Sequence, residues 1–458
     1  MNTWIARNLV YFPVQRVRGQ DPRPHLREAI RAQYLCPDEL AALRDEKVRR
    51  LVAYASEAVP YYRELFGRCG IRADRIRDCR ALTGVPVLTK SVILENEGRL
   101  LAAPFRSRVF PRKTGGSTGM TLHFTKDGSA LAANDAVMYR CYAWYGIGIG
   151  DRQARFWGVP VTAAPRWREK VKDAIGNRIR ISAFDISDSS CRTTYRRMLR
   201  FAPDYIYGYT TAIYGFSLTA KRLGFNLAAL PLKAVICTAE KMYPHHRTLL
   251  EDSFSCPVVD EYGSSENGVI AFQCARGRMH MMSDHLVIEF LGRDGKPVGP
   301  GELGTIVITD LSGYAMPLIR YEIGDMGRYS DESCGCGVSL PIMEIVEGRV
   351  EDFIRTESGT LIHAAYLCYT LKDDAIREFK MRQKALNSFV IQIVRSPSFS
   401  EGTEARVERN VRSALGQAVD IKFDYVDRIE REASGKLRYF VSETNELPGP
   451  RGFSDKPA

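Results

Sequence analysis

The chain has 458 residues, of which 45% are hydrophobic and 26% charged, and its net charge is +11. This composition is typical of a soluble protein with more than one compact unit, and no apolar run approaches the roughly 20 residues that cross a bilayer. Because Lys and Arg are spread along the whole sequence and form no nucleic-acid motif, we expect a solvated basic surface and no nucleic-acid partner.

The N-terminus and the cysteines indicate a cytoplasmic protein. The first residues, "MNTWIARNLVYFPVQRVRG", lack a continuous apolar stretch followed by a small-residue cleavage site. Their apolar residues, Trp4, Ile5 and Leu9 among them, lie beside arginines, and docking onto the protein itself is favoured over contact with a membrane surface. Eleven cysteines, an odd number scattered over the chain, are typical of a reducing compartment. We therefore expect no membrane association.

Helical and strand-like runs alternate along the first half of the chain. Residues 39–103 have apolar positions at steps of three and four, which predicts helices interrupted at Pro60 and ended by Gly70. A further helix is predicted over 129–147, capped near Asp127. Short apolar runs then alternate with helical ones, namely "QARFWGV", "DYIYGY", "LKAVICTAE" and "CPVVDEYG". This alternation predicts a largely parallel sheet covered on both faces.

The pattern changes in the second half. Over 285–330, Gly- and Asp-rich turns separate β-rich runs, which predicts an antiparallel or barrel-like section. Three parts are predicted: a large domain, a small C-terminal domain and a disordered Pro/Gly-rich tail, over residues 1–348, 349–445 and 446–458. The predicted fold class is α/β for the large domain, with parallel sheets plus the barrel-like section, and α+β for the small one.

The stretch "KTGGSTGM" at 113–120 could present backbone N–H groups and hydroxyls to a phosphate, since glycines let a backbone approach an anion closely. The candidate residues are Thr114, Gly115, Gly116, Ser117, Thr118 and Gly119. The stretch is not the common phosphate loop, because Met120 stands where that motif has a lysine. A flexible linker explains the same letters nearly as well.

A second polar cluster is "EYGSSENG" at 261–268, which follows a predicted strand. Tyr262 could stack on a flat base and Glu266 could hold a cation, whereas the plain alternative is an ordinary turn. In "IRYEIGDMG", Asp325 could accept both hydroxyls of a ribose or could belong to a simple Asp turn. "EGRVEDFIR" at 347–355 is a charged linker or a functional hinge, and Lys436 in "REASGKLRYF" would by itself be a surface lysine.

The order of these clusters resembles the adenylate-forming enzyme superfamily: a Ser/Thr/Gly loop, then Tyr-Gly-x-x-Glu, Gly-Asp, Gly-Arg-x-x-Asp and a late Ser-Gly-Lys. Within it the chain is similar to the phenylacetate–coenzyme A ligase family, especially its CapK-like branch, which is associated with capsular polysaccharide. Supporting segments are "VPYYRELF", "VPVLTKSVILEN", "TAEKMYPHHR" and "AMPLIRYEIGDMG". The resemblance covers about residues 40–440.

The resemblance implies a large domain and a small mobile lid that bind ATP and Mg²⁺ and form an acyl-adenylate, with coenzyme A as the next substrate. The catalytic residues would be Lys436 and Glu266. Glu266 would coordinate Mg²⁺, and Glu351 would lie at the hinge between the two domains. The residues implied in ATP or AMP binding are Thr114, Gly115, Gly116, Ser117, Thr118, Gly119, Ala239, Glu240, Tyr262, Gly263, Ser264, Asp325 and Arg349. Departures from the family pattern, Glu322 and Met120 among them, leave the substrate class and the second step open.

Cysteines and a histidine near the middle form a further candidate site. The site would consist of Cys274 and His280, which follow the Tyr262–Glu266 motif, and of Cys334 and Cys336, which follow Asp325. Both segments are next to motifs of the predicted nucleotide site. Three thiolates and one imidazole would make a closed, structural zinc site rather than a catalytic one. His285 is a possible substitute ligand. The alternative is reduced cysteines in a turn beside a surface histidine.

The acid substrate cannot be named from the sequence. Trp157, Tyr207 and Tyr209 are candidate pocket residues for a ring or an acyl chain, although such aromatic runs more often pack a core. No cationic residue marks a second acidic group on the substrate. Other acceptors remain open, since relatives transfer the acyl group or AMP to an amine or a hydroxyl. The alternative from a different class of function is a non-catalytic nucleotide-binding scaffold. The sequence does not reveal the oligomeric state.

Overall fold

The computed structural model describes the chain in two units, one reaching Glu347 and one starting at Phe353. Its description covers all residues except 106–108, 114–121, 159–165, 184, 186, 241, 293, 348–352, 356–360, 364–370, 372–374, 417, 431–439 and 444–458. The predicted tail and the predicted 348/349 boundary therefore lie outside the described residues, and the domain limits stay a prediction.

The N-terminal unit opens with helices. They are α1 (Thr3–Ile5), η1 (Ala6–Tyr11), α2 (Phe12–Val17), α3 (Arg23–Ala32), α4 (Pro37–Ala58), α5 (Pro60–Cys69), η2 (Ala73–Arg75), η3 (Arg80–Gly84), α6 (Lys90–Glu95), α7 (Glu97–Leu100) and η4 (Ala103–Phe105). The break between α4 and α5 falls at the predicted Pro60, and Gly70 ends α5 at a φ of +63°, which favours glycine. Both predicted helix limits are confirmed.

The remaining helices of this unit are α8 (Gly128–Ala143), α9 (Arg166–Ile175), α10 (Asp188–Phe201), α11 (Thr210–Arg222), η5 (Leu227–Ala229) and α12 (Pro244–Phe254). The predicted cap of α8 is confirmed, since the Asp127 carboxylate accepts a hydrogen bond from the backbone N–H of Ala130 at 2.9 Å. That bond satisfies one of the free N–H groups at the helix start.

An eleven-stranded sheet organises the N-terminal unit, in the order β10-β11-β12-β13-β9-β8-β7-β6-β5-β3-β4. Its parallel strands are β3 (Gln153–Trp157), β4 (Arg178–Ser182), β5 (Tyr205–Tyr209), β6 (Ala234–Thr238) and β7 (Val258–Ser264). All five residues of β6 are buried, as expected of a central parallel strand covered on both faces. The predicted parallel sheet is confirmed.

The rest of the sheet is antiparallel. Its strands are β8 (Gly268–Gln273), β9 (Met279–Met281), β10 (Leu286–Leu291), β11 (Gly304–Asp310), β12 (Tyr321–Ser330) and β13 (Ile342–Glu347). Antiparallel pairing therefore starts at β8, earlier than the predicted 285–330, because the motif "EYGSSENG" turns β7 back onto β8. Among the described strands β10 is an edge, so this section continues the parallel sheet instead of closing separately. A separate hairpin pairs β1 (Phe110–Lys113) with β2 (His123–Lys126).

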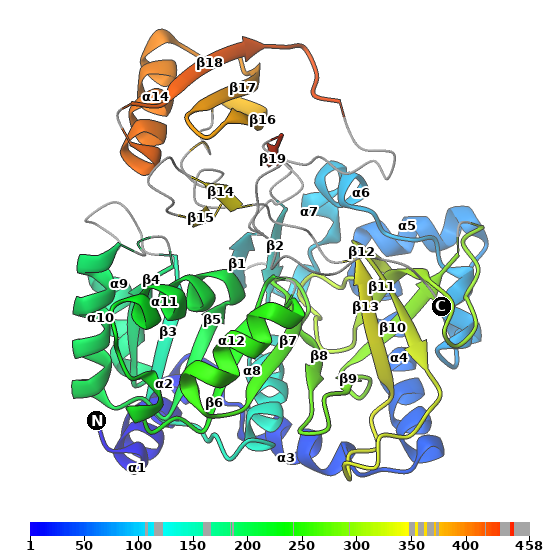
Figure 1. The fold of residues 1–458 in the computed structure, drawn as a ribbon. Coiled ribbons are helices and arrows are strands. Elements are labelled where there is room, and N and C mark those ends of the chain that lie inside the picture. The colour runs from blue at the N-terminus through cyan, green and yellow to red at the C-terminus, as the bar shows by residue number, and fades with distance from the viewer. Residues whose placement is uncertain are drawn as a thin grey trace, which may run out of the picture. The chain divides into compact units, whose positions relative to one another are not determined.

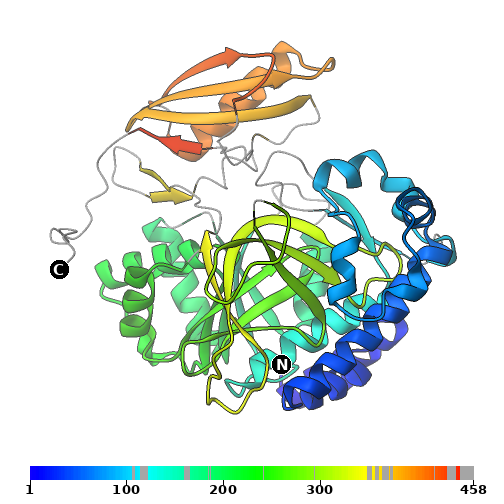
Figure 2. The same ribbon diagram turned by 90° about the vertical axis from the view of Figure 1, so that its right-hand side faces the viewer.

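Helices cover the sheet on both faces (Figure 1). On the parallel part, α10, α11 and α12 bury one face and α8 the other, so alternate β6 residues enter different cores: Val235 joins the first and Ile236 the second. Helices α4 and α5 pack on the antiparallel part, against residues such as Ile306 and Ile308. Figure 2 shows the N-terminal helices, in blue, alongside the sheet.

The C-terminal unit is small and of α+β type. Its strands are β14 (Phe353–Arg355), β15 (Leu361–His363), β16 (Ile376–Ala385), β17 (Ser388–Arg395), β18 (Asp420–Tyr425) and β19 (Phe440–Ser442), and its helix is α14 (Glu401–Leu415). Strands β18, β17, β16 and β19 form one mixed sheet in that order. Alternate residues of β17 pack with α14, Phe389 and Ile391 against Val407 and Val411 among them.

Among the described residues, no helix combines the length and the apolar character that crossing a bilayer requires.

Candidate functional site

The candidate site lies where the parallel half of the sheet meets the antiparallel half. Tyr262 stands near the end of β7, and Asp325 lies on β12, 63 positions further along the chain. The Tyr262 hydroxyl donates a hydrogen bond of 2.8 Å to the Asp325 carboxylate. Two predicted nucleotide-binding residues from different motifs are therefore in direct contact.

Glu266 lies in the turn between β7 and β8 and is 6% exposed. Its carboxylate accepts a hydrogen bond of 3.0 Å from the hydroxyl of Tyr321, at the start of β12. It forms no ion pair with a basic residue in the part of the chain that the structure describes. A buried carboxylate is costly unless a cation or donors compensate it, and carboxylate oxygens suit Mg²⁺. The residues present therefore fit a magnesium ion at Glu266.

The turn that carries Glu266 is tight. A side chain at Gly263 would place a Cβ 2.6 Å from the backbone oxygen of Gly268, so only glycine fits there. The Ser264 hydroxyl accepts a hydrogen bond of 3.0 Å from the backbone N–H of Asn267. In this structure Gly263 and Ser264 therefore shape the turn that presents Tyr262 and Glu266.

Ala239 and Glu240 follow β6 at the same edge of the sheet. Ala239 has a φ of +69°, a strained value for a residue with a side chain. The Glu240 carboxylate accepts a hydrogen bond of 2.8 Å from the backbone N–H of Thr211, in the first turn of α11. A negative charge stabilises that end of a helix, so the Glu240 side chain fixes the start of α11, and its part in adenine binding stays a prediction.

Several predicted site residues lie outside the described residues. They are Thr114, Gly115, Gly116, Ser117, Thr118, Gly119, Arg349, Glu351 and Lys436. Their roles stay predictions that rest on the resemblance.

The predicted substrate residues form an aromatic cluster at the carboxyl ends of β3 and β5. Trp157 stacks on Tyr207 with ring centroids 5.7 Å apart and an angle of 15°, and its ring lies 4.3 Å from that of Tyr209. All three side chains are partly exposed. An exposed aromatic surface suits a ring or an acyl chain.

A buried polar group that the sequence analysis missed adjoins this cluster. The Glu261 carboxylate, 5% exposed, accepts hydrogen bonds from the hydroxyls of Tyr142 at 3.1 Å and Tyr207 at 3.2 Å. Burial raises its pKa, although hydroxyls that include Thr238 oppose this. Glu261 stood inside the quoted "EYGSSENG", and Tyr321 inside "IRYEIGDMG". The alternation of strand side chains could have identified Tyr321, which lies four residues before Asp325 on β12. It could not have identified Glu261, because consecutive residues of β7 alternate in direction and Glu261 precedes Tyr262.

The four predicted metal ligands are brought together. The ligand atoms of Cys274, His280, Cys334 and Cys336 all lie within 4.8 Å of one another. The Cys274 and Cys334 sulfurs are 3.5 Å apart, and the Cys336 sulfur is 3.3 Å from Nε2 of His280. His285 lies elsewhere, with Nε2 at 2.9 Å from the Asn134 side-chain oxygen.

The tautomer of His280 and the lowered pKa of Cys274 suit a metal, whereas burial and the other two thiols raise the pKa of Cys334 to about 11. Nδ1 of His280 lies 2.7 Å from the Leu340 carbonyl oxygen, which can only accept, so Nδ1 carries the proton and Nε2 offers its lone pair. Burial lowers the pKa of His280. Burial raises the pKa of the Cys274 thiol. Hydrogen bonds from the backbone of Arg278 and Arg276 and from the other two thiols outweigh burial, so the pKa of Cys274 lies below its usual value. The donor set fits a closed, tetrahedral zinc site.

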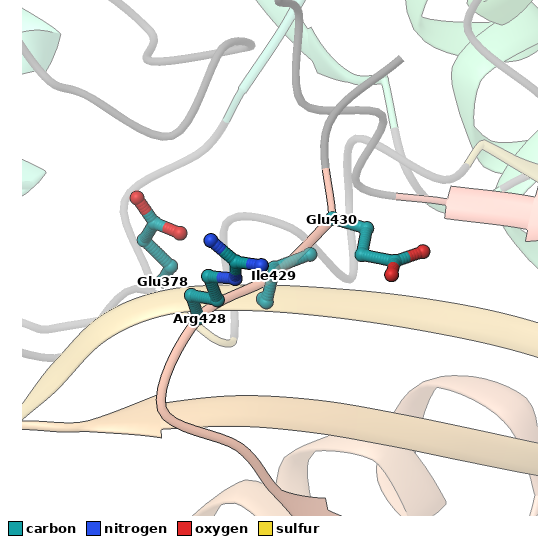
Figure 3. A pocket seen from close by; sticks show the side chains of 4 residues that line it. All are labelled: Glu378, Arg428, Ile429 and Glu430. Atoms are coloured by element: carbon teal, nitrogen blue, oxygen red, sulfur yellow. The ribbon is translucent and has the colours of Figure 1, made fainter.

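The C-terminal unit has an open hollow of its own, of about 460 Å³. Figure 3 shows its lining: the side chains of Glu378 and Arg428 point the same way, and that of Glu430 points away from them. In sequence the hollow immediately precedes 431–439, the segment with the predicted catalytic lysine. None of the predicted nucleotide-binding residues lines this hollow. We therefore do not assign the reaction to it.

Comparisons with known proteins show what the chain as a whole is similar to. A protein of Thermus thermophilus named phenylacetate-coenzyme A ligase is 23% identical over 434 residues, which cover 88% of this chain and 96% of that protein. Protein CapK of Staphylococcus aureus is 20% identical over 432 residues, 91% of this chain and 92% of that protein. The structure of 2-hydroxyisobutyryl-CoA ligase with 2-HIB-AMP and CoA matches with a TM-score of 0.65 at 17% identity, over 90% of this chain and 91% of that one.

The chain therefore has the fold of the adenylate-forming CoA ligases. More narrowly, residues 354–443 match the family described as the CapK C-terminal domain. The predicted resemblance and fold class are confirmed by these matches.

Proposed function

We propose that the protein uses ATP to activate a carboxylic acid as an acyl-adenylate, releasing pyrophosphate, and then transfers the acyl group to coenzyme A. The observation that supports this most is the 2.8 Å hydrogen bond between Tyr262 and Asp325. It joins two separate motifs of the resemblance within a fold that CoA ligases share, at an edge of the sheet where α/β proteins bind ligands.

The described residues support the nucleotide half of this reaction by position. Tyr262 offers an aromatic face to the adenine, while its hydroxyl orients Asp325 towards the ribose hydroxyls. In the adenylation step a substrate carboxylate oxygen bonds to the α-phosphorus and the bond to pyrophosphate breaks. Such a step needs positioning and stabilisation of developing negative charge more than covalent help. Lys436 is the proposed cation for the α-phosphate.

Two metals belong to the proposal. Glu266 would hold Mg²⁺, which neutralises phosphate charge when bound, and its burial beside the Tyr321 hydroxyl supports this role. Zn²⁺ would be held by the Cys/His cluster, where it would join β8 and β9 to the loop that follows β12. The zinc role is structural, because four protein ligands leave no open position.

The setting of the reaction is proposed as cytoplasmic, where ATP and coenzyme A are available. The described cysteines support this, since all ten are free of disulfide bonds. A role in cell-surface polysaccharide biosynthesis is proposed from the similarity to Protein CapK. Acids, nucleotide and coenzyme A are the proposed partners.

ATP–pyrophosphate exchange tests the proposal directly, with a panel of aryl, hydroxy and aliphatic acids. We expect exchange with at least one acid, and thioester formation when coenzyme A is added. Lys436→Ala should lower exchange by on the order of 10²–10³-fold, as loss of one preorganised donor does in other enzymes. Exchange without thioester would redirect the second step to an amine or hydroxyl acceptor. No exchange with any acid would leave a nucleotide-binding scaffold.

A further inference from the structure

The strand order of the sheet reverses beside β3. The chain runs from β3 outward to β4, then returns across β3 to β5 and continues to β6 and β7. In open α/β sheets, ligands bind outside the carboxyl ends of the strands at such a reversal. The reversal here lies between β3 and β5, and these two strands carry Trp157, Tyr207 and Tyr209.

Arg155 adds a positive charge to this aromatic cluster. It lies directly opposite Tyr207 in the pairing of β3 with β5. Its guanidinium carbon is 4.5 Å from the centroid of the Trp157 ring and 5.3 Å from that of Tyr207. Aromatic faces attract a guanidinium and hold it in place. This contact uses the faces of the guanidinium and leaves its N–H groups for hydrogen bonds.

Within the described residues, the Arg155 guanidinium has no carboxylate in ion-pair contact. Its Nε is shielded from water and has no hydrogen-bond partner, while the side chain as a whole is partly exposed. The nearby Glu261 carboxylate is hydrogen-bonded by tyrosine hydroxyls, and the Arg155 charge acts on it only at longer range, where it lowers the pKa of Glu261. The cations of β4, Arg178 and Arg180, are both paired with Asp173.

This environment disfavours the Arg155 charge. Burial lowers the pKa of Arg155, and the like charges on β4 add to this, although Tyr207 opposes it. A partly desolvated cation without a partner is unfavourable unless an anion joins it. A guanidinium with its faces fixed and its N–H groups available matches the geometry of a carboxylate or a phosphate.

From this geometry we propose that Arg155 binds a second anionic group on the acid that the enzyme activates. The inference rests on the proposed function and gives its substrate class: acids with two anionic groups, whose connecting part packs against Trp157 and Tyr209. It revises the expectation that no cationic residue marks such a group. Arg155 was overlooked because it stands inside the short apolar strand "QARFW".

The test measures adenylation alone, by ATP–pyrophosphate exchange without coenzyme A, so that the phosphates of coenzyme A cannot contribute. Acids are supplied in matched pairs: straight-chain dicarboxylic acids with monocarboxylic acids of the same length, a benzenedicarboxylic acid with benzoic acid, and a phosphorylated hydroxy acid with its parent. We expect the wild-type protein to prefer the doubly charged member. The carboxylate and phosphate pairs show which anion Arg155 binds.

Variants then assign the preference to Arg155. Arg155→Met should raise KM for the preferred doubly charged acid by on the order of 10²-fold, as truncation of one partner of a buried charge pair does. Its kcat, and KM for the singly charged acid, should stay near the wild-type values. Arg155→Lys keeps the charge without the planar fork, and should give an intermediate KM.

A matched control and a stability measurement complete the test. Arg222→Met makes the same change of charge at an exposed residue of α11 paired with Asp188, and should change neither KM. Because Arg155 has no ion pair within the described residues, and methionine can also pack on the Trp157 and Tyr207 rings, Arg155→Met should melt close to the wild type. Three outcomes would overturn the inference but leave the proposed function intact. The wild type could prefer singly charged acids, or Arg155→Met could lose activity equally with both acids of a pair. Arg155→Met could also have a lowered melting temperature with an unchanged preference among acids. Exchange with no acid overturns the proposed function and the inference with it.

Discussion

The parallel and antiparallel halves of the sheet are stabilised in different ways. The parallel half, β3 to β7, is covered by helices on both faces, and its central strand β6 is buried throughout. The antiparallel half is covered by α4 and α5 and carries buried ionic groups such as Arg320 with Glu289, at 3.0 Å. The Cys/His cluster lies in this half, at β8, β9 and the loop after β12.

The candidate site uses both halves. Tyr262 ends the last parallel strand, Glu266 lies in the connecting turn, and Tyr321 and Asp325 come from the antiparallel strand β12. The aromatic cluster with Arg155 belongs to the parallel half alone. We therefore expect changes in the parallel half to alter acid specificity, and changes at the junction or in the antiparallel half to alter nucleotide use or stability.

The largest expected effect is at the junction. Glu266→Gln should lower the exchange rate by on the order of 10²–10³-fold, because the amide keeps the shape but loses the charge proposed to hold Mg²⁺. Exchange is measured over a range of Mg²⁺ concentrations, and the apparent Mg²⁺ affinity should fall as well. Glu344→Gln, at an exposed carboxylate of β13, is the control. Unchanged Mg²⁺ dependence in Glu266→Gln would assign the ion to another residue.

The next effect concerns the stability of the antiparallel half. Purified protein should contain about one zinc ion per chain by elemental analysis, and Cys336→Ser should lose it because a closed site needs all four ligands. The variant should melt several degrees lower, since metal binding contributes to folding free energy. Cys256→Ser, at a partly buried cysteine outside the cluster, should keep both zinc and stability. Wild-type protein free of zinc that melts like Cys336→Ser would contradict the prediction.

A smaller effect is expected from the hydroxyl of Tyr262. Tyr262→Phe keeps the ring but removes the hydrogen bond to Asp325, and should raise KM for ATP about tenfold, since bonds to charged groups contribute roughly 1.5–3 kcal/mol. The preference among acids should not change. Tyr329→Phe, on the same β12, is the matched control. A changed acid preference with unchanged KM for ATP would break the proposed division between the halves.

The sequence predicted those parts of the molecule in which each local pattern agrees with the fold. The helices 39–103, the parallel strands and the Cys/His grouping were predictable, because periodicity, caps and ligand types each indicate one structure. The β7–β8 hairpin was not predictable, because the residues of "EYGSSENG" form both the turn of the hairpin and part of the candidate site. Arg155 was missed for a physical reason: its role depends on ring contacts between β3 and β5 that no local pattern encodes.

The smallest effect is a pH dependence confined to the parallel half. Burial raises the pKa of Asp260 on β7 from 3.8 to about 7; Arg247 opposes the shift and Glu261 adds to it. Between these two values the unfolded chain has lost the proton and the folded chain retains it. Stability is therefore full at low pH and declines as pH rises towards 7, and the decline ends above that value.

Asp260→Asn should flatten this decline, because an amide does not titrate. Denaturant unfolding of the wild type and the variant, followed from about pH 4.5 to about pH 7.5, measures the difference in slope. Asp252→Asn, the same change at an exposed carboxylate on α12, should keep the wild-type slope. If Asp260→Asn and the wild type lose stability equally over this range, Asp260 is ionised in the folded protein. Its charge would then have to be balanced by Arg247, and the parallel half would contain an ion pair on β7 in addition to those that β4 forms with Asp173.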